Sequence, residues 1–478
     1  MTTLRAAFLI AACTLSGACT TMQAGAPVAP PAVVQAEPRA KNVILFIGDG
    51  MGISTVTAAR IYAGQKLGKS GEEHQLSFDT FDNVALVKTY NVNAQVPDSA
   101  GTATAIHSGV KTNIGMIGVG PGASRGDCAV GQEHYLPLLG EEVKRRGLAL
   151  GIVSTARITH ATPASVYARS VDRDWEADAA IPEGQRGPDC RDIARQLVDS
   201  EFDVALGGGS AAFFGGDAGG RRVNAADDLA REWTARTGGN VVVTREEMLA
   251  AADDAPVLGL FAPSHMTYTA EREPDTSEPT LTEMTAKAIR HLSADQDGYY
   301  LMVESGRIDH GHHAGQAGLA LEDAVEFDRA IRYALDNTDP AETLIMVTAD
   351  HSHVFTIAGY PRRGNDILGL VVPPEGGGED DADAGEGPTL AQDGKPYTTL
   401  SYANGPGAVQ GERPVPETGV GAKQQSLVPL GSETHGGEDV AIYATGPGAD
   451  RVRGVIEQNV IYDIIRRAFG WAASTDTE

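Results

Sequence analysis

Residues 42–47, Asn42-Val43-Ile44-Leu45-Phe46-Ile47, form an apolar run that ends in the loop Gly48-Asp49-Gly50. An uninterrupted run of this kind is typical of a strand that is buried on both faces of a parallel sheet. Further apolar runs also end in loops rich in polar residues and glycine. They cover residues 148–153, 203–206, 299–303 and 344–348.

Amphipathic patterns separate these runs and predict helices over residues 135–146, 189–199, 317–335 and 455–469. Strands that alternate with helices indicate an α/β fold, with a mostly parallel central sheet covered by helices on both faces. In such sheets the functional site lies beyond the carboxyl ends of the strands. The ionisable residues of this chain cluster at those ends.

Residues 358–430 depart from this pattern, because the helical periodicity fades and Gly, Pro and Tyr become frequent. We interpret this stretch as a subdomain inserted between two strands. Residues 40–357 and 431–478 would then form the two parts of one α/β domain. Within the insertion, residues 375–386 are dominated by Gly, Asp and Glu and are predicted to be a solvated loop.

The composition limits the possible functions. The chain has 478 residues, 42% of them hydrophobic, and a formal net charge of -26. This charge argues against nucleic acid as a specific partner, because nucleic-acid binding needs a basic surface. It would also repel an anionic substrate, so a phosphate site would need local positive charge from metal ions or arginine.

The N-terminus, residues 1–19, is predicted to be an export signal. Arg5 precedes an apolar run at residues 6–15 that is too short to span a membrane as a mature helix. Residues 15–19, Leu-Ser-Gly-Ala-Cys, resemble a lipoprotein cleavage box, although Ser16 stands where Leu is usual. Acylation of Cys19 and release into a periplasmic or extracellular space therefore both stay open, and residues 20–39 would form a flexible tether.

Export would leave Cys128 and Cys190 as the cysteines of the mature protein. In an oxidising compartment, two cysteines suggest one disulfide that closes a long loop. The alternative is a pair of unpaired, buried thiols.

Two segments carry residues with metal-ligand chemistry. In residues 304–313, Asp309 and His313 are four positions apart, so on a helix they share a face and can bind one ion. Asp350 and His351 directly follow an apolar run and can converge on a metal where the chain turns. Carboxylate with imidazole is an ordinary zinc set. The alternatives are a His-rich surface turn and a capping Asp with a structural His.

Two loops offer further ligands. His435 precedes another apolar run, residues 440–444, and could complete the zinc set begun by Asp309 and His313. Asp49 is presented by the Gly-Asp-Gly turn, although a lone motif of this kind is often a plain turn.

A serine and an arginine suit a phosphate group. Ser99 precedes a helical segment of small residues, where backbone N–H groups and the helix dipole favour an anion. From this segment alone, a capping role for Ser99 is the better interpretation. Thr162 offers a hydroxyl that magnesium accepts, and Arg173 offers a planar fork for two phosphate oxygens. Nearby His107 is interpreted as a structural or surface residue.

Together these segments resemble the alkaline phosphatase family, closest to its animal-type branch, from about residue 41 to residue 469. The motifs that carry the resemblance are Asp98-Ser99-Ala100, the Arg-Ile-Asp-His-Gly-His-His run at 307–313 and the Thr-Ala-Asp-His-Ser-His-Val-Phe run at 348–355. The inserted stretch resembles the crown domain of that family, especially at residues 397–407. The resemblance implies a three-layer α/β/α sandwich, a homodimer, and hydrolysis of phosphate monoesters through a phosphoserine.

The resemblance also implies a role for each site residue. Ser99 is the nucleophile, and Arg173 holds the phosphate, oriented by Asp98. His160, His310 and His353 match positions just outside the metal ligands. The metal ligands are Asp309, His313 and His435 for one zinc; Asp49, Asp350 and His351 for the other; and Asp49, Thr162 and Glu304 for magnesium. Cys128 and Cys190 fall where the animal-type branch has a disulfide.

The sequence departs from that branch at the expected calcium site. Animal-type enzymes carry a calcium ligand directly after a Leu-Phe pair, and here Leu260-Phe261 is followed by Ala262. Glu278 could supply another ligand, but the calcium site is doubtful.

Two rival functions are a phosphodiesterase or sulfatase of the same superfamily, and a non-catalytic metal-binding surface protein. The magnesium set and Arg173 favour a doubly charged monoester. The presence of Ser99 and of every ligand position argues against a non-catalytic protein.

Overall fold

The computed structural model describes residues 39–376 and 387–471, which belong to one compact unit. The expected export signal with Cys19, nearly all of the expected tether and most of the acidic run at 375–386 lie outside the described residues. In the part described, no helix combines the length and the apolar character that crossing a bilayer requires.

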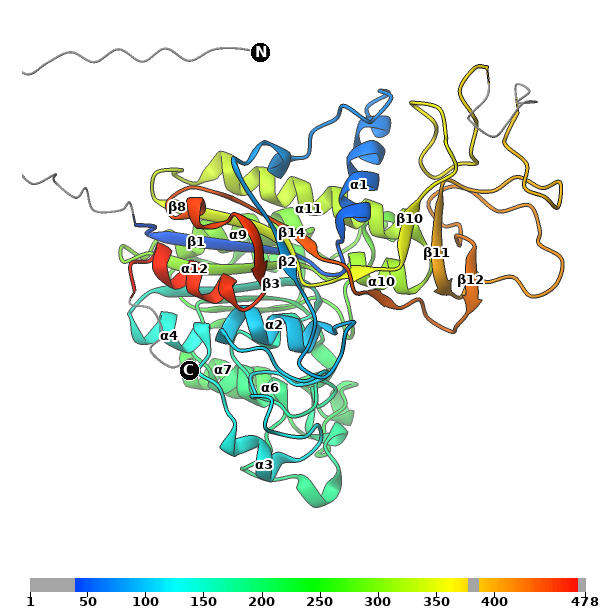
Figure 1. The fold of residues 1–478 in the computed structure, drawn as a ribbon. Helices are drawn as coiled ribbons and strands as arrows, with labels where there is room; N and C mark the ends of the chain where they lie inside the picture. The colour runs from blue at the N-terminus through cyan, green and yellow to red at the C-terminus, as the bar shows by residue number, and fades with distance from the viewer. Residues whose placement is uncertain (1–38, 377–386, 472–478) are drawn as a thin grey trace, which may run out of the picture. The chain divides into compact units, whose positions relative to one another are not determined.

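A large sheet lies at the centre of this unit, with its strands in the order β15-β2-β14-β8-β1-β7-β3-β4-β6-β5 (Figure 1). The neighbouring strands pair in parallel, except that β14 runs antiparallel to both β2 and β8. The strands β7 and β8 are buried along their whole length, as their continuous apolar sequences predict. The strand bounds are β1 Asn42–Gly48, β2 Asn83–Lys88, β3 Ala149–Arg157, β4 Val204–Gly208, β5 Asn240–Val242, β6 Val257–Leu260, β7 Tyr299–Ser305, β8 Thr343–Ala349, β14 Val440–Thr445 and β15 Gly454–Glu457.

Helices cover both faces of this sheet and complete a three-layer α/β/α arrangement, as predicted. In Figure 1, α11 lies above the sheet, and α2, α4 and α12 lie below it; α1 and α9 pack against α11. The helix bounds are α1 Ile53–Lys66, α2 Ser99–Ser108, α3 Cys128–Glu133, α4 Leu139–Arg145, α5 Ala161–Ala164, α6 Ile193–Asp199, α7 Leu229–Thr237, α8 Arg245–Ala250, α9 Leu281–Leu292, α10 Arg307–His313, α11 Ala317–Asn337 and α12 Val460–Ala468.

Three predicted helices begin later than their sequence patterns indicate. The helix expected from residue 189 starts at Ile193, because Asp192 caps it by accepting a hydrogen bond from the N–H of Arg195. The helix expected from residue 455 starts at Val460, because residues 454–457 pair with β2 as the edge strand β15. The helix expected from residue 135 starts at Leu139. Before it, Leu136 donates its N–H to Gly118, and the following Pro137 disfavours helical backbone at Leu136.

A separate three-stranded sheet stands beside the central one in Figure 1. It consists of β10 Phe355–Ile357, β11 Leu400–Gly405 and β12 Ser426–Pro429. A short antiparallel pair, β9 Ser352–His353 with β13 His435–Gly436, lies outside both sheets. The division of the chain into an insertion at 358–430 and two flanking parts stays a prediction.

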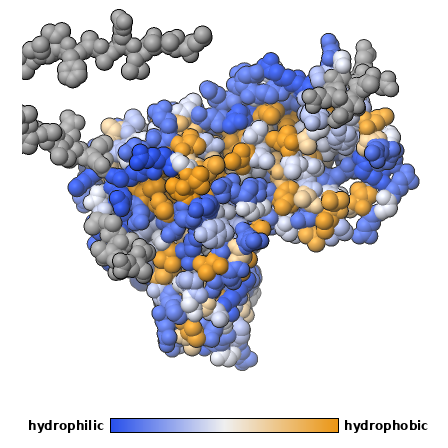
Figure 2. Space-filling view, viewed as in Figure 1, coloured by the Kyte–Doolittle hydropathy of each residue, from blue (hydrophilic) through white to orange (hydrophobic). Residues whose placement is uncertain are grey.

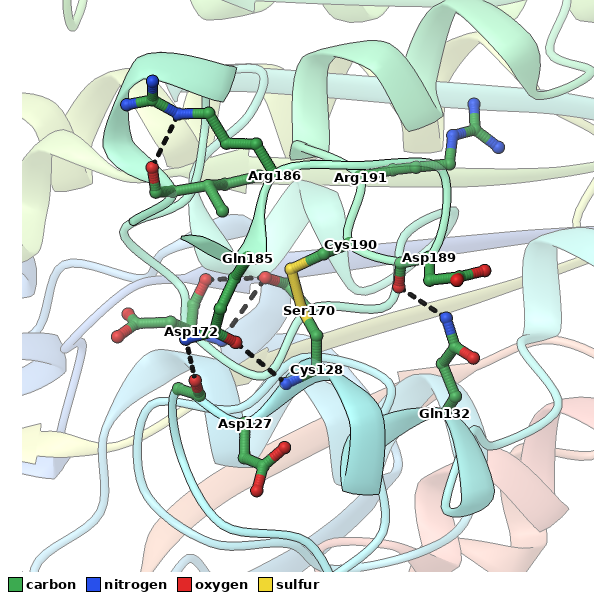
Figure 3. Close-up of a disulfide and its surroundings, with 12 residues drawn as sticks. Asp127, Cys128, Gln132, Ser170, Asp172, Gln185, Arg186, Asp189, Cys190 and Arg191 are labelled. Atoms are coloured by element: carbon green, nitrogen blue, oxygen red, sulfur yellow. Dashed lines mark hydrogen bonds between the residues drawn. A yellow bond between two sulfur atoms is a disulfide. The ribbon is translucent and has the colours of Figure 1, made fainter. Parts of the chain in front are cut away.

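The predicted disulfide is present. Cys128, at the start of α3, is bonded to Cys190, which is 62 positions further along the chain (Figure 3). The loop ends are also joined beside it, because Gln132 donates to the carbonyl of Asp189 at 2.5 Å and Gln185 donates to the carbonyl of Gly126 at 2.8 Å.

Replacing both cysteines by serine should destabilise the protein. In the chain-entropy model, opening a loop of this length costs up to about 4 kcal/mol. We expect a lower Tm and a lower denaturant midpoint for Cys128→Ser/Cys190→Ser, measured by circular dichroism. Reductant should lower the Tm of the parent chain and leave the double variant unchanged. Equal Tm values for parent and variant would contradict this account.

Candidate metal centre

The predicted ligands gather at one edge of the central sheet. Asp49 follows β1, Glu304 is near the end of β7, and Asp350 follows β8. Because β14 runs antiparallel to the others, the segment that precedes it, with His435, also lies at this edge. Side chains that follow the parallel strands and side chains that precede the antiparallel strand β14 therefore lie at the same edge of the sheet.

The turn after β1 requires glycine. Gly50 has a φ of +67°, and a Cβ at this position would lie 2.3 Å from Nε2 of His353. The Gly50 N–H donates to Oδ1 of Asp350 at 3.0 Å. The turn thus fixes Asp49 beside the carboxylate that follows β8.

The first cluster contains Asp309, His313 and His435. Nε2 of each histidine lies 3.4 Å from Oδ1 of Asp309, and the two Nε2 atoms are 3.1 Å apart. The Nδ1 atoms face backbone carbonyls, of Glu433 for His313 at 2.6 Å and of Pro97 for His435 at 2.8 Å. A carbonyl can only accept, so Nδ1 carries the proton and two bare Nε2 lone pairs face each other. A cation between them satisfies both.

The second cluster contains Asp49, Asp350 and His351, all fully buried. Nδ1 of His351 lies 3.2 Å from the carbonyl of Ser352, so its Nε2 also bears the lone pair. This Nε2 is 3.4 Å from Oδ1 of Asp49 and 3.3 Å from Oδ2 of Asp350. The set offers one nitrogen and carboxylate oxygens, which suits zinc.

The third cluster is marked by buried oxygens that have no hydrogen-bond partner among residues 39–376 and 387–471. They are Oδ2 of Asp49, Oε1 of Glu304 and Oγ1 of Thr162. The other Glu304 oxygen accepts a hydrogen bond from Ser154. His160 lies in the same group as Asp49 and Glu304. Orphaned buried oxygens of this kind fit a hard cation that prefers oxygen ligands.

The electrostatics of the three clusters also fit cations. Burial and the neighbouring carboxylates, Asp350 first, raise the pKa of Asp49 well above its usual range. Burial raises the pKa of Glu304 to about 7 and also raises the pKa of Asp350. These carboxylates cannot all ionise in a dry site unless positive charge is supplied.

His353 supplies part of that charge from within the chain. Its Nε2 lies 2.9 Å from Oδ1 of Asp309, and its Nδ1 lies 2.5 Å from Oε2 of Glu433. Burial opposes protonation, but these hydrogen bonds raise the pKa of His353 to about 10. Against the effect of burial, the facing histidines hold the pKa of Asp309 well below its usual range.

Ser99 is the first residue of α2 and faces the second cluster. Its Oγ lies 3.2 Å from Nε2 of His351 and 3.5 Å from Oδ1 of Asp49. The helix is capped by Asp98, which accepts from the N–H of Gly101 at 3.1 Å. Capping is therefore not the role of Ser99, and its hydroxyl is directed at the candidate ligands.

Arg173 is held in place by two partners. One terminal nitrogen donates to Oδ2 of Asp98 at 2.9 Å, and the other lies 3.0 Å from Nε2 of His160. Burial would raise the pKa of Asp98, but the charge of Arg173 and hydrogen bonds from Gly115 and Gly101 lower it. An ionised Asp98 therefore orients the guanidinium.

Three neighbouring residues were not assigned from the sequence. Glu433 binds His353, Ser154 binds Glu304, and the ring of His265 lies 4.0 Å from that of His310. Glu433 is two positions from His435 and Ser154 follows the apolar run 148–153, but no local signal shows which distant residues they contact.

The doubtful calcium ligand has other partners. Glu278 accepts hydrogen bonds from the N–H and the hydroxyl of Thr267 at 2.9 and 3.1 Å, and it lies 3.7 Å from Arg272. Its carboxylate is thus paired within the chain.

Comparison with known proteins identifies the family. A profile described as "Alkaline phosphatase" matches residues 40–470. The tissue-nonspecific alkaline phosphatase of Gallus gallus is 46% identical over 447 residues, which are 88% of this chain and 83% of the relative. An alkaline phosphatase of Gadus morhua is 43% identical, covering 88% of this chain and 90% of the relative.

Solved structures support the fold. The crystal structure of Thermus thermophilus alkaline phosphatase matches with a TM-score of 0.66 at 24% identity, covering 94% of this chain and 96% of that one. That of the Antarctic bacterium TAB5 matches with a TM-score of 0.64 at 23% identity, covering 91% and 100%. These matches bear on the fold, and the family profile and the close relatives show that the chain belongs to the alkaline phosphatase family of metal-dependent phosphate monoesterases.

Proposed function

We propose that the chain hydrolyses phosphate monoesters through a covalent phosphoserine on Ser99, with two zinc ions and one magnesium ion beside it. The observation that carries this proposal is the 3.2 Å separation between Oγ of Ser99 and the bare Nε2 of His351. A hydroxyl at a helix start, facing a set of metal ligands, is suited to act as a nucleophile toward an anion.

The donor atoms divide the metals among the clusters. Sets with imidazole nitrogen suit zinc, and the oxygen set suits magnesium. When bound, the ions would supply Lewis-acid stabilisation of charge on the phosphoryl group. The proposed ligands are Asp309, His313 and His435 for one zinc; Asp49, Asp350 and His351 for the other; and Asp49, Thr162 and Glu304 for magnesium.

Side chains of the protein position the phosphate group for attack by Ser99. Arg173, fixed by Asp98 and His160, holds two non-bridging phosphate oxygens with its planar fork. The Ser99 oxygen then bonds to phosphorus while the alcohol leaves. Water subsequently cleaves the phosphoserine, which releases inorganic phosphate and restores the hydroxyl.

Ser99→Ala should abolish the covalent intermediate and reduce kcat by about 10⁴-fold or more, as loss of a nucleophile does elsewhere. The phosphoenzyme is detected by acid quench and mass spectrometry. The value of kcat is measured with p-nitrophenyl phosphate as the substrate. Ser108→Ala, at the other end of the same helix, is the matched control and should keep both signals. A phosphoenzyme in Ser99→Ala would refute the assignment.

Chelation should remove activity, and zinc with magnesium should restore it. Plasma mass spectrometry should find two zincs and one magnesium per chain. His435→Ala should bind one zinc fewer and lose about 10²-fold or more in kcat, because one electrostatic stabiliser is lost. His74→Ala, outside all three clusters, is the control and should keep the full content. Full zinc content in His435→Ala would contradict the ligand assignment.

We also propose export and a homodimer. The disulfide suits an oxidising compartment, and members of the family are typically exported. Figure 2 shows apolar residues gathered over the β2–β14 region, where Val84 and Leu86 of β2 and Val455 of β15 are exposed. A second copy is the occupant proposed for this face.

Native mass spectrometry of the protein isolated from its source should give the mass of two chains that lack the N-terminal signal. A diacylglycerol adduct on Cys19 would mark a lipid anchor, and its absence a released protein. A monomer would contradict the dimer, and an intact first residue would contradict processing.

A further inference from the structure

We propose that His107 is a positioning residue that fixes Thr162 relative to Glu304 and to the nucleophile helix. The inference deepens the proposed function and rests on it, because it concerns Thr162 and Glu304, two of the three candidate ligands of the magnesium cluster.

His107 is fully buried near the end of α2, the helix that begins with Ser99. Its Nε2 lies 2.9 Å from the hydroxyl of Tyr300 on β7. Its Nδ1 lies 2.8 Å from Oγ of Ser165 and 3.2 Å from the carbonyl of Ala103. One imidazole therefore joins three elements: α2, β7 and the segment just after α5.

The hydrogen bonds can point in only one direction if every buried proton is to have an acceptor. In the part of the chain described, the Tyr300 hydroxyl has no other partner, so it donates to Nε2. Nδ1 then carries the ring proton and donates to Ser165. Ser165 in turn donates to the carbonyl of Thr162 at 2.7 Å. The reverse orientation would leave Tyr300 and the Thr162 carbonyl unsatisfied.

The same ring remains neutral, since burial lowers the pKa of His107 to about 4. The direction of the chain of hydrogen bonds is therefore constant over the neutral and alkaline range.

Both ends of this chain of hydrogen bonds lead to the magnesium cluster: one end is at Thr162, and the other is at Tyr300, on the strand that carries Glu304. Tyr300 and Glu304 are four positions apart on β7, so their side chains lie on the same face of the sheet. Thr162 lies in α5, which has four residues and no side-chain cap. So short a helix has little stability of its own, and contacts with neighbouring elements must hold Thr162 in place. Ser165 and His107 supply such a contact.

The test compares His107→Leu and Ser165→Ala with Ser108→Ala. Ser108→Ala removes a similar buried hydrogen bond, from Oγ to the carbonyl of Thr104 at 2.7 Å, in the same helix but without a link to α5. Magnesium binding to the zinc-loaded protein is measured by titration calorimetry, and the Tm by calorimetric scanning. His107→Asn keeps an N–H in the place of Nδ1 and serves as the conservative variant.

We expect His107→Leu and Ser165→Ala to weaken magnesium binding about tenfold, as loss of a residue that orients a ligand does elsewhere. The double variant should be no weaker than the single ones, zinc content should not change, and His107→Asn should recover part of the affinity. Magnesium affinities equal to that of Ser108→Ala would overturn the inference, even if the Tm falls.

The smaller Ser165→Ala change decides the matter if His107→Leu does not fold. A parent chain that binds no magnesium would instead overturn the proposed function. The two failures are therefore distinguishable.

Discussion

The crowding of buried carboxylates at one edge of the sheet is the constraint on which the rest of the site depends. Asp49, Glu304, Asp309 and Asp350 have almost no contact with water, and most of them are close to one another. Such a group is tolerable only when cations share the space. Protonated His353 and the guanidinium of Arg173 supply positive charge from the chain itself, and bound cations would supply the remainder.

The surrounding structure orients the lone pairs of three histidines toward the proposed positions of those ions. Three histidines, His313, His351 and His435, each place Nδ1 against a backbone carbonyl, so that Nε2 is bare and directed inward. The backbone thus selects the tautomer before any ligand arrives. A folded chain with this arrangement has a preorganised site, and metal binding needs little rearrangement of the rings.

Much of the fold could be predicted from continuous apolar segments such as residues 42–47, because burial on both faces of a sheet leaves a clear signature. That the candidate ligands Asp49 and Asp350 lie together at strand ends could be predicted for the same reason. Glu433 could not, because its position depends on the pairing of β13 with β9, which sets His435 opposite His353. The amphipathic pattern predicts a helix from residue 455, because no local signal indicates that residues 454–457 form an edge strand. The contacts of His107 could not be predicted because both of its side-chain partners, Tyr300 and Ser165, are distant in sequence.

The antiparallel strand β14 has a consequence for the folding of the newly synthesised chain. It lies between β8 and β2, so the sheet is continuous only when residues 440–445 are in place, and His435 arrives with the same segment. A nascent chain that stops short of this strand has an interrupted sheet and an incomplete first cluster. A chain truncated before β13 and β14 would therefore keep the residues of the second and third clusters but lack His435 and the strand that joins β8 to β2.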